Sequence, residues 1–120
     1  MKKNIMKKGI YRLNFDCGRS GKLQGIFIDT DIRVNKAIEC GVHVYFGEVL
    51  GKHSEVIGPI EENDIELVTE DENAVSVFEK YELQTGFNPF NYQHSGFEQE
   101  EDDLTEIETL GDVVDYLLTK

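Results

Sequence analysis

Hydrophobic and polar side chains alternate through residues 10–17, which is the pattern of a strand that buries one face. A glycine-bounded turn at 18–21 separates this segment from a second apolar run at 23–28. The two segments therefore predict a β-hairpin. The side chains on the expected inward face of its first strand are Tyr11, Leu13, Phe15 and Cys17.

A short helix is expected directly after this hairpin. Residues 29–31 read Asp-Thr-Asp, and these residue types accept hydrogen bonds from the first N–H groups of a helix. Apolar residues then recur at helical spacing, and Gly41 stands where a helix commonly ends. The expected inward side chains are Val34, Ala37 and Ile38.

The middle of the chain predicts a second hairpin, a short strand and a second helix. Residues 42–50 carry the strongest strand pattern and return through 55–58, where Pro59 indicates an early end or an edge position. After a short strand at 65–68, Thr69 and Glu72 have the spacing of a capping box. The helix that they would open runs to about Leu83, with inward side chains at Ala74, Val77, Phe78 and Tyr81.

The C-terminal region divides into an irregular aromatic segment at 86–96, an acidic run at 98–103 and an amphipathic helix. The apolar stripe of that helix consists of Leu110, Val113, Val114, Leu117 and Leu118. The order of elements predicts an α+β fold: a small antiparallel or mixed sheet, built from two hairpins plus a short strand, with two to three helices on one face. We expect residues 1–97 to form the core domain after a flexible basic start. Residues 98–120 would form an acidic segment and a helix that either packs on the core or serves as an interaction tail.

Composition narrows the class of protein. A chain of 120 residues suits one domain. No apolar run approaches the roughly 18 residues of a membrane-spanning helix, and the start lacks the apolar stretch of a secretory signal. These features predict a cytoplasmic protein in which Cys17 and Cys40 are reduced thiols.

Charge is distributed unevenly along the chain. Residues 1–52 hold ten Lys/Arg against five Asp/Glu, a net of +5, whereas residues 53–120 hold two against nineteen, a net of −17. The acidic part would repel nucleic acid and attract a basic surface, such as that of a nucleic-acid-binding protein. Acidity can also serve solubility alone, so a partner is an expectation that needs its own evidence.

The aromatic segment and the acidic run are the expected partner-binding region. Aromatic rings beside Asn and Gly have the composition of recognition loops, and neighbouring carboxylates would steer a basic partner toward them. The alternative is that the rings fold back over the sheet as a lid. The predicted contact residues are Phe87, Asn88, Phe90, Tyr92, Glu100, Glu101, Asp102 and Asp103.

A different class of function is suggested by the two hairpin turns. Their glycines and basic side chains would form a rim suited to a nucleotide or another small anion, if both turns lie at one end of the fold. The residues around Gly51 differ from a phosphate-binding P-loop in spacing and in lacking a following helix. The candidate ligand-binding residues are Arg19, Lys22, Lys52, His53 and Ser54.

Catalysis and metal binding have weaker support. Cys17 lies at a strand end, where a nucleophile can be exposed, but alternation places it on the core face. Cys40 and His43 have metal-ligand spacing, and Cys17, His53 and His94 are the other available ligands, yet no second closely spaced pair exists. We therefore expect no enzymatic activity, no cofactor and no metal.

The leading hypothesis is a small acidic binding protein that engages a basic protein partner and contacts neither nucleic acid nor membrane directly. In size and acidity the chain is similar to inhibitors encoded by phages and mobile elements, such as anti-restriction and anti-CRISPR proteins, although it shares no motif with them. That similarity implies an inhibitory role against a defence system of the host. The apolar stripe of the last helix leaves a homodimer as a further possibility.

Overall fold

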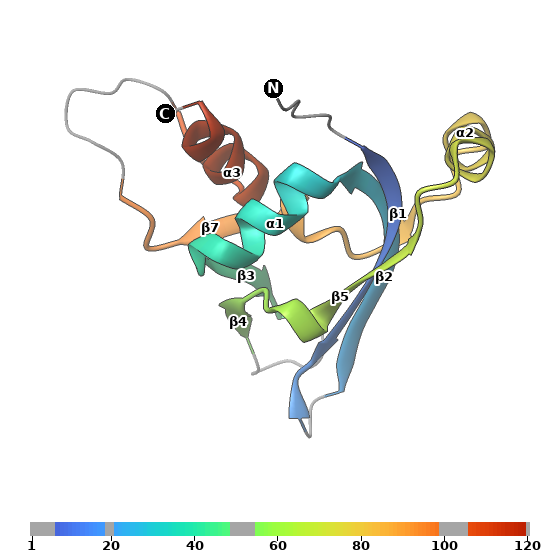
Figure 1. The fold of residues 1–120 in the computed structure, drawn as a ribbon. Coiled ribbons are helices and arrows are strands. Elements are labelled where there is room, and N and C mark those ends of the chain that lie inside the picture. The colour runs from blue at the N-terminus through green and yellow to red at the C-terminus, as the bar shows by residue number, and fades with distance from the viewer. Residues whose placement is uncertain (1–6, 19–20, 49–54, 99–105, 120) are drawn as a thin grey trace.

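The structure, a computed structural model, describes residues 7–18, 21–48, 55–98 and 106–119. Its three α-helices, two short 3₁₀ helices and seven strands within these residues alternate along the chain (Figure 1). In order they are β1 (Lys8–Asp16), β2 (Lys22–Thr30), α1 (Asp31–Cys40), β3 (His43–Gly47), β4 (Val56–Pro59), η2 (Glu62–Asp64), β5 (Ile65–Thr69), α2 (Glu72–Lys80), β6 (Thr85–Gly86), η3 (Pro89–Asn91), β7 (Gln93–Ser95) and α3 (Leu110–Leu118).

The strands form two antiparallel sheets. Sheet A has the order β5-β1-β2-β6 and sheet B the order β4-β3-β7. The predicted α+β class is confirmed, and so are both hairpins, which fall in different sheets. In Figure 1, α1, α3 and sheet B lie on one side of the curved sheet A and α2 lies on the other. Helices therefore cover both faces of sheet A, whereas the sequence pattern predicted one.

Alternation along β1 sorts its side chains between these two faces. Tyr11 and Leu13 point into the main core together with Phe27 of β2. Ile10 points the other way and packs beneath α2. Because β1 buries side chains on both faces of sheet A, its register with the neighbouring strands is fixed.

Helix α1 confirms the expectation from its capping residues. The Thr30 hydroxyl accepts a hydrogen bond from the Arg33 N–H at 3.3 Å and so satisfies one of the first backbone donors. The helix ends at Gly41, whose φ of +65° is the left-handed conformation that glycine adopts without strain. Val34 and Ala37 are buried, as their spacing predicts.

Helix α2 differs from the prediction in both its start and its inward face. Asp71, not Thr69, caps the helix: its carboxylate accepts a hydrogen bond from the Ala74 N–H at 3.1 Å. Thr69 is the last residue of β5. Val75 and Phe78 are the buried pair. Val77 and Tyr81, which we predicted to be inward, are exposed by 50% and 61%.

The segment after α2 crosses the edge of sheet A and enters the core. A Cβ atom on Gly25 of β2 would overlap the backbone of Phe87, so the crossing requires glycine at this position. The predicted irregular segment then contains η3 and the three-residue strand β7, which pairs with β3. No local pattern predicts β7, because its partner strand lies 50 residues earlier in the chain.

Helix α3 packs on the core. Leu110 and Val114 belong to the main hydrophobic cluster, and the helix lies against α1 and η3. The last helix thus takes the first of the two roles that its pattern left open. In the part of the chain that the structure describes, no helix is both long enough and apolar enough to span a membrane.

Candidate functional site

Rings of the aromatic segment join the two sheets. Phe90 meets Phe27 of sheet A edge-on, with ring centres 6.1 Å apart. Tyr92 lies 5.0 Å from Phe46 of sheet B, and Phe87 contacts both of these rings. Phe90 is only 4% exposed, and the other two are half-buried against the same core. Core packing is therefore an established role of these rings.

The predicted partner-binding role of the same segment stays a prediction. The Asn88 side chain accepts a hydrogen bond from the Phe90 N–H at 3.1 Å and begins η3, so it too has a structural task. The acidic part of the predicted site lies outside the described residues. It consists of Glu100, Glu101, Asp102 and Asp103.

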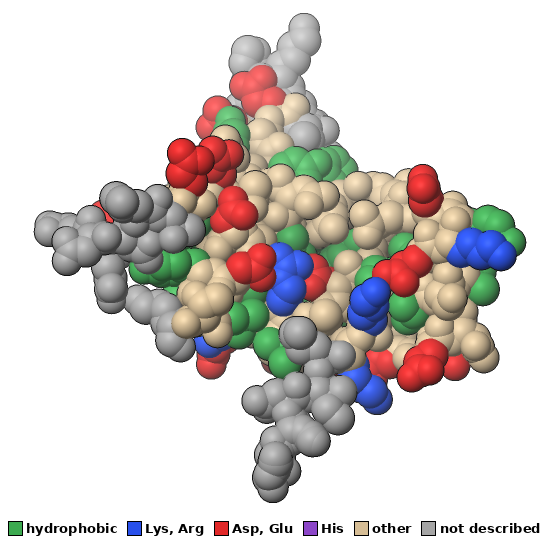
Figure 2. All heavy atoms as spheres, turned by 90° about the horizontal axis from the view of Figure 1, so that it is seen from above, with side chains coloured by type: hydrophobic (Ala, Val, Ile, Leu, Met, Phe, Trp, Pro, Cys, Tyr) green, Lys and Arg blue, Asp and Glu red, His purple; other side chains and the backbone are tan. Residues whose placement is uncertain are grey.

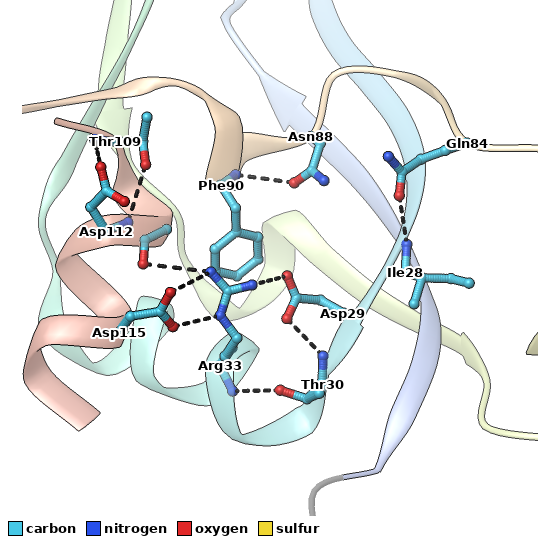
Figure 3. Close-up of polar contacts among 11 residues, drawn as sticks. Ile28, Asp29, Thr30, Arg33, Gln84, Asn88, Phe90, Thr109, Asp112 and Asp115 are labelled. Carbon is cyan, nitrogen blue, oxygen red and sulfur yellow. Dashed lines mark hydrogen bonds and ion pairs between the residues drawn. The ribbon is translucent and has the colours of Figure 1, made fainter. Parts of the chain in front are cut away.

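A cluster centred on Arg33 connects β2, α1, η3 and α3 (Figure 3). The guanidinium donates from Nη1 to the Asp29 carboxylate at 2.7 Å and from Nε to the Asp115 carboxylate at 2.9 Å. Its central carbon lies 4.8 Å from the centre of the Phe90 ring. Nη2 reaches Asp115 at 3.4 Å and the Gly111 carbonyl at 3.5 Å. One side chain thus contacts residues up to 82 positions away from it along the chain.

Gly111 lets α3 approach this cluster closely. A Cβ atom there would stand 2.9 Å from Arg33 Nη2 and 3.0 Å from the Phe90 carbonyl oxygen. Both separations are shorter than ordinary van der Waals contacts, so a larger residue would push α3 away from α1 and η3. The glycine is buried in the first turn of the helix.

The two carboxylates that flank Arg33 differ in their surroundings. Asp29 is 8% exposed, and its burial raises its pKa despite the opposing effects of the Thr30 N–H and Arg33. The side chain of Asp115 is 61% exposed. Nearby, hydrogen bonds from the Glu108 and Thr109 N–H groups lower the pKa of Asp112. The bond from Thr109 belongs to the capping box that starts α3, together with the bond from the Asp112 N–H to the Thr109 hydroxyl.

The Arg33 cluster is a structural junction. Nε, Nη1 and Nη2 each donate to an acceptor of the protein itself, so the guanidinium is engaged within the fold. Sequence reasoning missed Arg33. The only local sign was the spacing of four residues between Asp29 and Arg33, which matches a helical ion pair.

The structure gives little support to thiol chemistry. Burial, followed by Asp16 and Asp64, raises the pKa of Cys17, which disfavours the nucleophilic thiolate. Cys17 and Cys40 are free thiols.

The structure also places one of the candidate metal ligands: His94 bonds to the Ile107 carbonyl oxygen through Nε2 at 3.0 Å. Among the described residues, no three His, Cys, Asp or Glu side chains are grouped in a way that would hold a metal ion.

The two hairpins start their turns close together. Phe15, near the end of β1, lies 5.6 Å ring to ring from Phe46, near the end of β3. Lys22 is exposed at the start of β2. The remaining members of the predicted anion-binding rim lie outside the described residues, so that rim stays a prediction; they are Arg19, Lys52, His53 and Ser54.

Exposed apolar side chains and acidic residues occur together on the consecutive elements β5 and α2. The apolar side chains are 41–61% exposed, and they are Leu67, Val68, Val77, Tyr81 and Leu83. Residues 61–82 around them contain nine Asp/Glu and a single Lys. We call the apolar side chains together with these acidic ones the β5–α2 surface. At the end of the molecule formed by α2, hydrophobic side chains lie beside charged ones (Figure 2).

Three basic residues, two in β1 and one directly before it, offset part of this negative charge. Lys7 pairs with Glu70 at 3.7 Å, Lys8 with Glu79 at 2.9 Å and Arg12 with Glu66 at 3.1 Å. Each pair has at least one exposed side chain, so each contributes at most about 1 kcal/mol to stability. The surface retains a negative balance after they are counted.

Sequence reasoning missed this surface because it assigned Val77 and Tyr81 to the core. The signal that could have located it was the density of acidic residues between 61 and 82, which the half-chain charge count had averaged into a longer region.

Comparison of the chain with protein-family models, with curated proteins and with solved structures finds no match.

Proposed function

We propose that this protein is a non-enzymatic binding protein and that its β5–α2 surface engages a basic protein partner. The observation that carries the proposal is the combination of exposed apolar side chains with a dense acidic surround on two consecutive elements. Each feature alone has an ordinary explanation, since single apolar residues are common on protein surfaces and acidity aids solubility. Their coincidence is the composition of a binding surface with a charged margin.

The apolar residues supply the part of the surface that gains from being covered. Tyr81 is 61% exposed, and its ring lies at the surface 5.4 Å from the positively charged Lys80 ammonium. Val77, one helical turn earlier, is half exposed. Covering such side chains yields roughly 25 cal/mol for each Å² of apolar area removed from water. Aromatic residues are enriched among the anchors of protein interfaces.

The acidic residues determine the kind of partner. Glu62, Glu72 and Glu82 are exposed, and repulsion between carboxylates disfavours another acidic surface. A basic partner would be attracted over a distance of roughly 10 Å at 0.1 M salt. Proteins that bind nucleic acid carry such basic surfaces. Covering one would make this chain an inhibitor, the role that its likeness to phage-encoded inhibitors in size and acidity also suggests.

The test compares two triple variants with equal change of net charge. The first, Glu62→Gln, Glu72→Gln and Glu82→Gln, removes charge from the β5–α2 surface. The control, Glu48→Gln, Glu98→Gln and Glu106→Gln, removes it from exposed positions outside residues 61–82. Affinity for the partner recovered from the native host is measured at low and at moderate salt.

We expect the first variant to bind about tenfold or more weakly, with a shallower dependence on salt, and the control to bind as the unmodified chain does. Equal affinity of all three proteins would contradict the proposal. A loss confined to the control would place the interface outside the β5–α2 surface.

A further inference from the structure

We propose that the free edge of β5 takes up an extended basic segment of the partner as an additional strand of sheet A. This inference rests on the proposed function and specifies the form in which the partner is recognised. Strand addition supplies affinity through main-chain hydrogen bonds, which an edge strand leaves available, and specificity through the side chains on either side.

Among the residues that the structure describes, β5 pairs with a strand on one side only. That strand is β1, and β5 is the outermost strand of sheet A. With five residues it is the longest outermost strand in the described part of the chain, compared with four in β4, three in β7 and two in β6. A row of backbone donors and acceptors therefore faces outward along the strand, as at any sheet edge.

The β5 edge lacks two of the devices that commonly protect edge strands and has a third, a β-bulge at Val68. It contains neither Pro nor Lys, the residue types that commonly prevent strand pairing, and its one charged residue, Glu66, forms an ion pair with Arg12. The competing edge strand β4 ends in Pro59. A register shift leaves Val68 without a partner in β1, because Ile10 pairs with Thr69 and the next pair joins Tyr11 to Leu67.

Apolar side chains are exposed where an added strand would lie. Leu67 is 45% exposed, and Val68, at the bulge, is 41% exposed. An incoming segment with β-branched or other apolar residues at its centre would cover both. The edge thus offers cross-strand contacts in addition to hydrogen bonds.

Charge selects a basic segment over a second copy of this chain. Acidic residues precede β5 at Glu61, Glu62 and Asp64, and others follow it at Glu70, Asp71 and Glu72. Lysines or arginines at both ends of an extended segment would meet these carboxylates. Antiparallel pairing of β5 with β5 of a second copy would bring the two acidic flanks together, and like charges in such positions repel.

The test uses a labelled synthetic peptide of about nine residues, with two lysines at each end and alternating valine and threonine between them. Two N-methylated forms of it carry the modification on alternate residues, so that each form loses the backbone donors of one edge without a change of charge. Affinity for the full chain is measured by fluorescence anisotropy at about 0.05 M and about 0.3 M salt.

We expect the unmodified peptide to bind, to lose affinity with salt, and to lose about tenfold or more when the edge that faces β5 is methylated. Methylation of the other edge should have a small effect. Amide hydrogen exchange in residues 65–69 should slow when the unmodified peptide is bound.

Equal binding of both methylated forms, with salt dependence retained, would overturn strand addition and leave the proposed function standing. Absence of peptide binding at low salt would overturn strand addition too. Salt-independent binding would contradict the proposed function itself.

A pair of protein variants provides a second test of where the peptide binds. Leu67→Lys and Leu83→Lys add the same charge at similarly exposed positions, the first on the β5 edge and the second after α2. We expect Leu67→Lys to weaken peptide binding more than Leu83→Lys, and equal effects would count against the β5 edge. If the unmodified chain sediments as a dimer that Leu67→Lys alone dissociates, the edge belongs to a second copy and the proposal is wrong.

Discussion

Replacement of Arg33 by methionine should expose the unequal importance of its two carboxylate partners. The substitution keeps an unbranched stem near Phe90 and removes the charge that faces Asp29, whose side chain is only 6% exposed. An unpaired buried charge typically costs about 3–5 kcal/mol. The Arg33 side chain is 26% exposed, so water reaches the site and we reduce this to about 2–3 kcal/mol.

The other partner should matter less. Asp115→Asn removes a carboxylate that is 61% exposed, and such pairs contribute about 0–1 kcal/mol. Asp29→Asn should cost about 1–2 kcal/mol, because its carboxamide oxygen can still accept the Thr30 N–H and Arg33 retains Asp115. The expected order of destabilisation is therefore Arg33→Met first, Asp29→Asn second and Asp115→Asn last.

Urea unfolding followed by circular dichroism measures these differences. The decisive protein is the double variant Arg33→Met with Asp29→Asn, in which the uncompensated buried charge is gone. It should be about as stable as Arg33→Met or more stable, so that the two costs do not add. Additive costs, or a larger loss from Asp115→Asn than from Asp29→Asn, would refute the argument that burial of Asp29 determines the effect.

The pH dependence gives the same reasoning an independent check. Burial raises the pKa of Asp29 above its value in the unfolded chain, so the folded protein holds this proton more tightly. The group therefore favours folding below its unfolded pKa, and that contribution is lost as pH rises through its folded pKa. Without Arg33 the pKa of Asp29 should rise further. The deficit of Arg33→Met should consequently shrink as pH falls and the carboxylate is protonated.

Three further outcomes follow from the fold. Gly25→Ala should destabilise the protein by about 3 kcal/mol or more or prevent folding, because its Cβ would overlap the Phe87 backbone; near-normal urea stability would contradict the crossing. Val114→Ala in the core should cost about 1–2 kcal/mol and Leu118→Ala, which is 37% exposed, well under about 1 kcal/mol; equal costs in urea unfolding would argue against the packing of α3. Burial raises the pKa of Tyr11 to about 12 from 10.0, so the contribution of Tyr11 to stability should be lost as pH rises through that range. Spectrophotometric titration should show one phenol that ionises late and is missing in Tyr11→Phe; the same late ionisation in both proteins would contradict this.

The sequence predicted the elements whose signals are local. Alternation along β1 and β2, the Thr30 cap and Gly41 each act within a few residues, and tertiary packing reinforces them. Helix α2 shows where local signals are ambiguous. Thr69 and Asp71 both suit a helix start, and Phe78 belongs to the inward stripe under either assignment. The packing of Val75 and Phe78 against Ile10, which no local pattern shows, distinguishes the two.

Features made by distant segments could not be predicted from local patterns. Strand β7 exists because β3 offers it an edge, and the Arg33 cluster joins Asp29 of β2 to Asp115 of α3. The aromatic segment illustrates the same limit for function. Its composition suits either a recognition loop or a core lid, and the burial of Phe90 shows the core role. The β5–α2 surface became visible only when Val77 and Tyr81 proved to be outside.

The location of the binding surface is the claim on which the functional account depends most. Amide hydrogen exchange of the full chain, measured with and without the basic partner recovered at low salt, tests it directly. We expect slower exchange in residues 61–83, strongest in β5, with little change in β7 and α3. Protection confined to the hairpin turns, or to the acidic run and the aromatic segment, would contradict this claim.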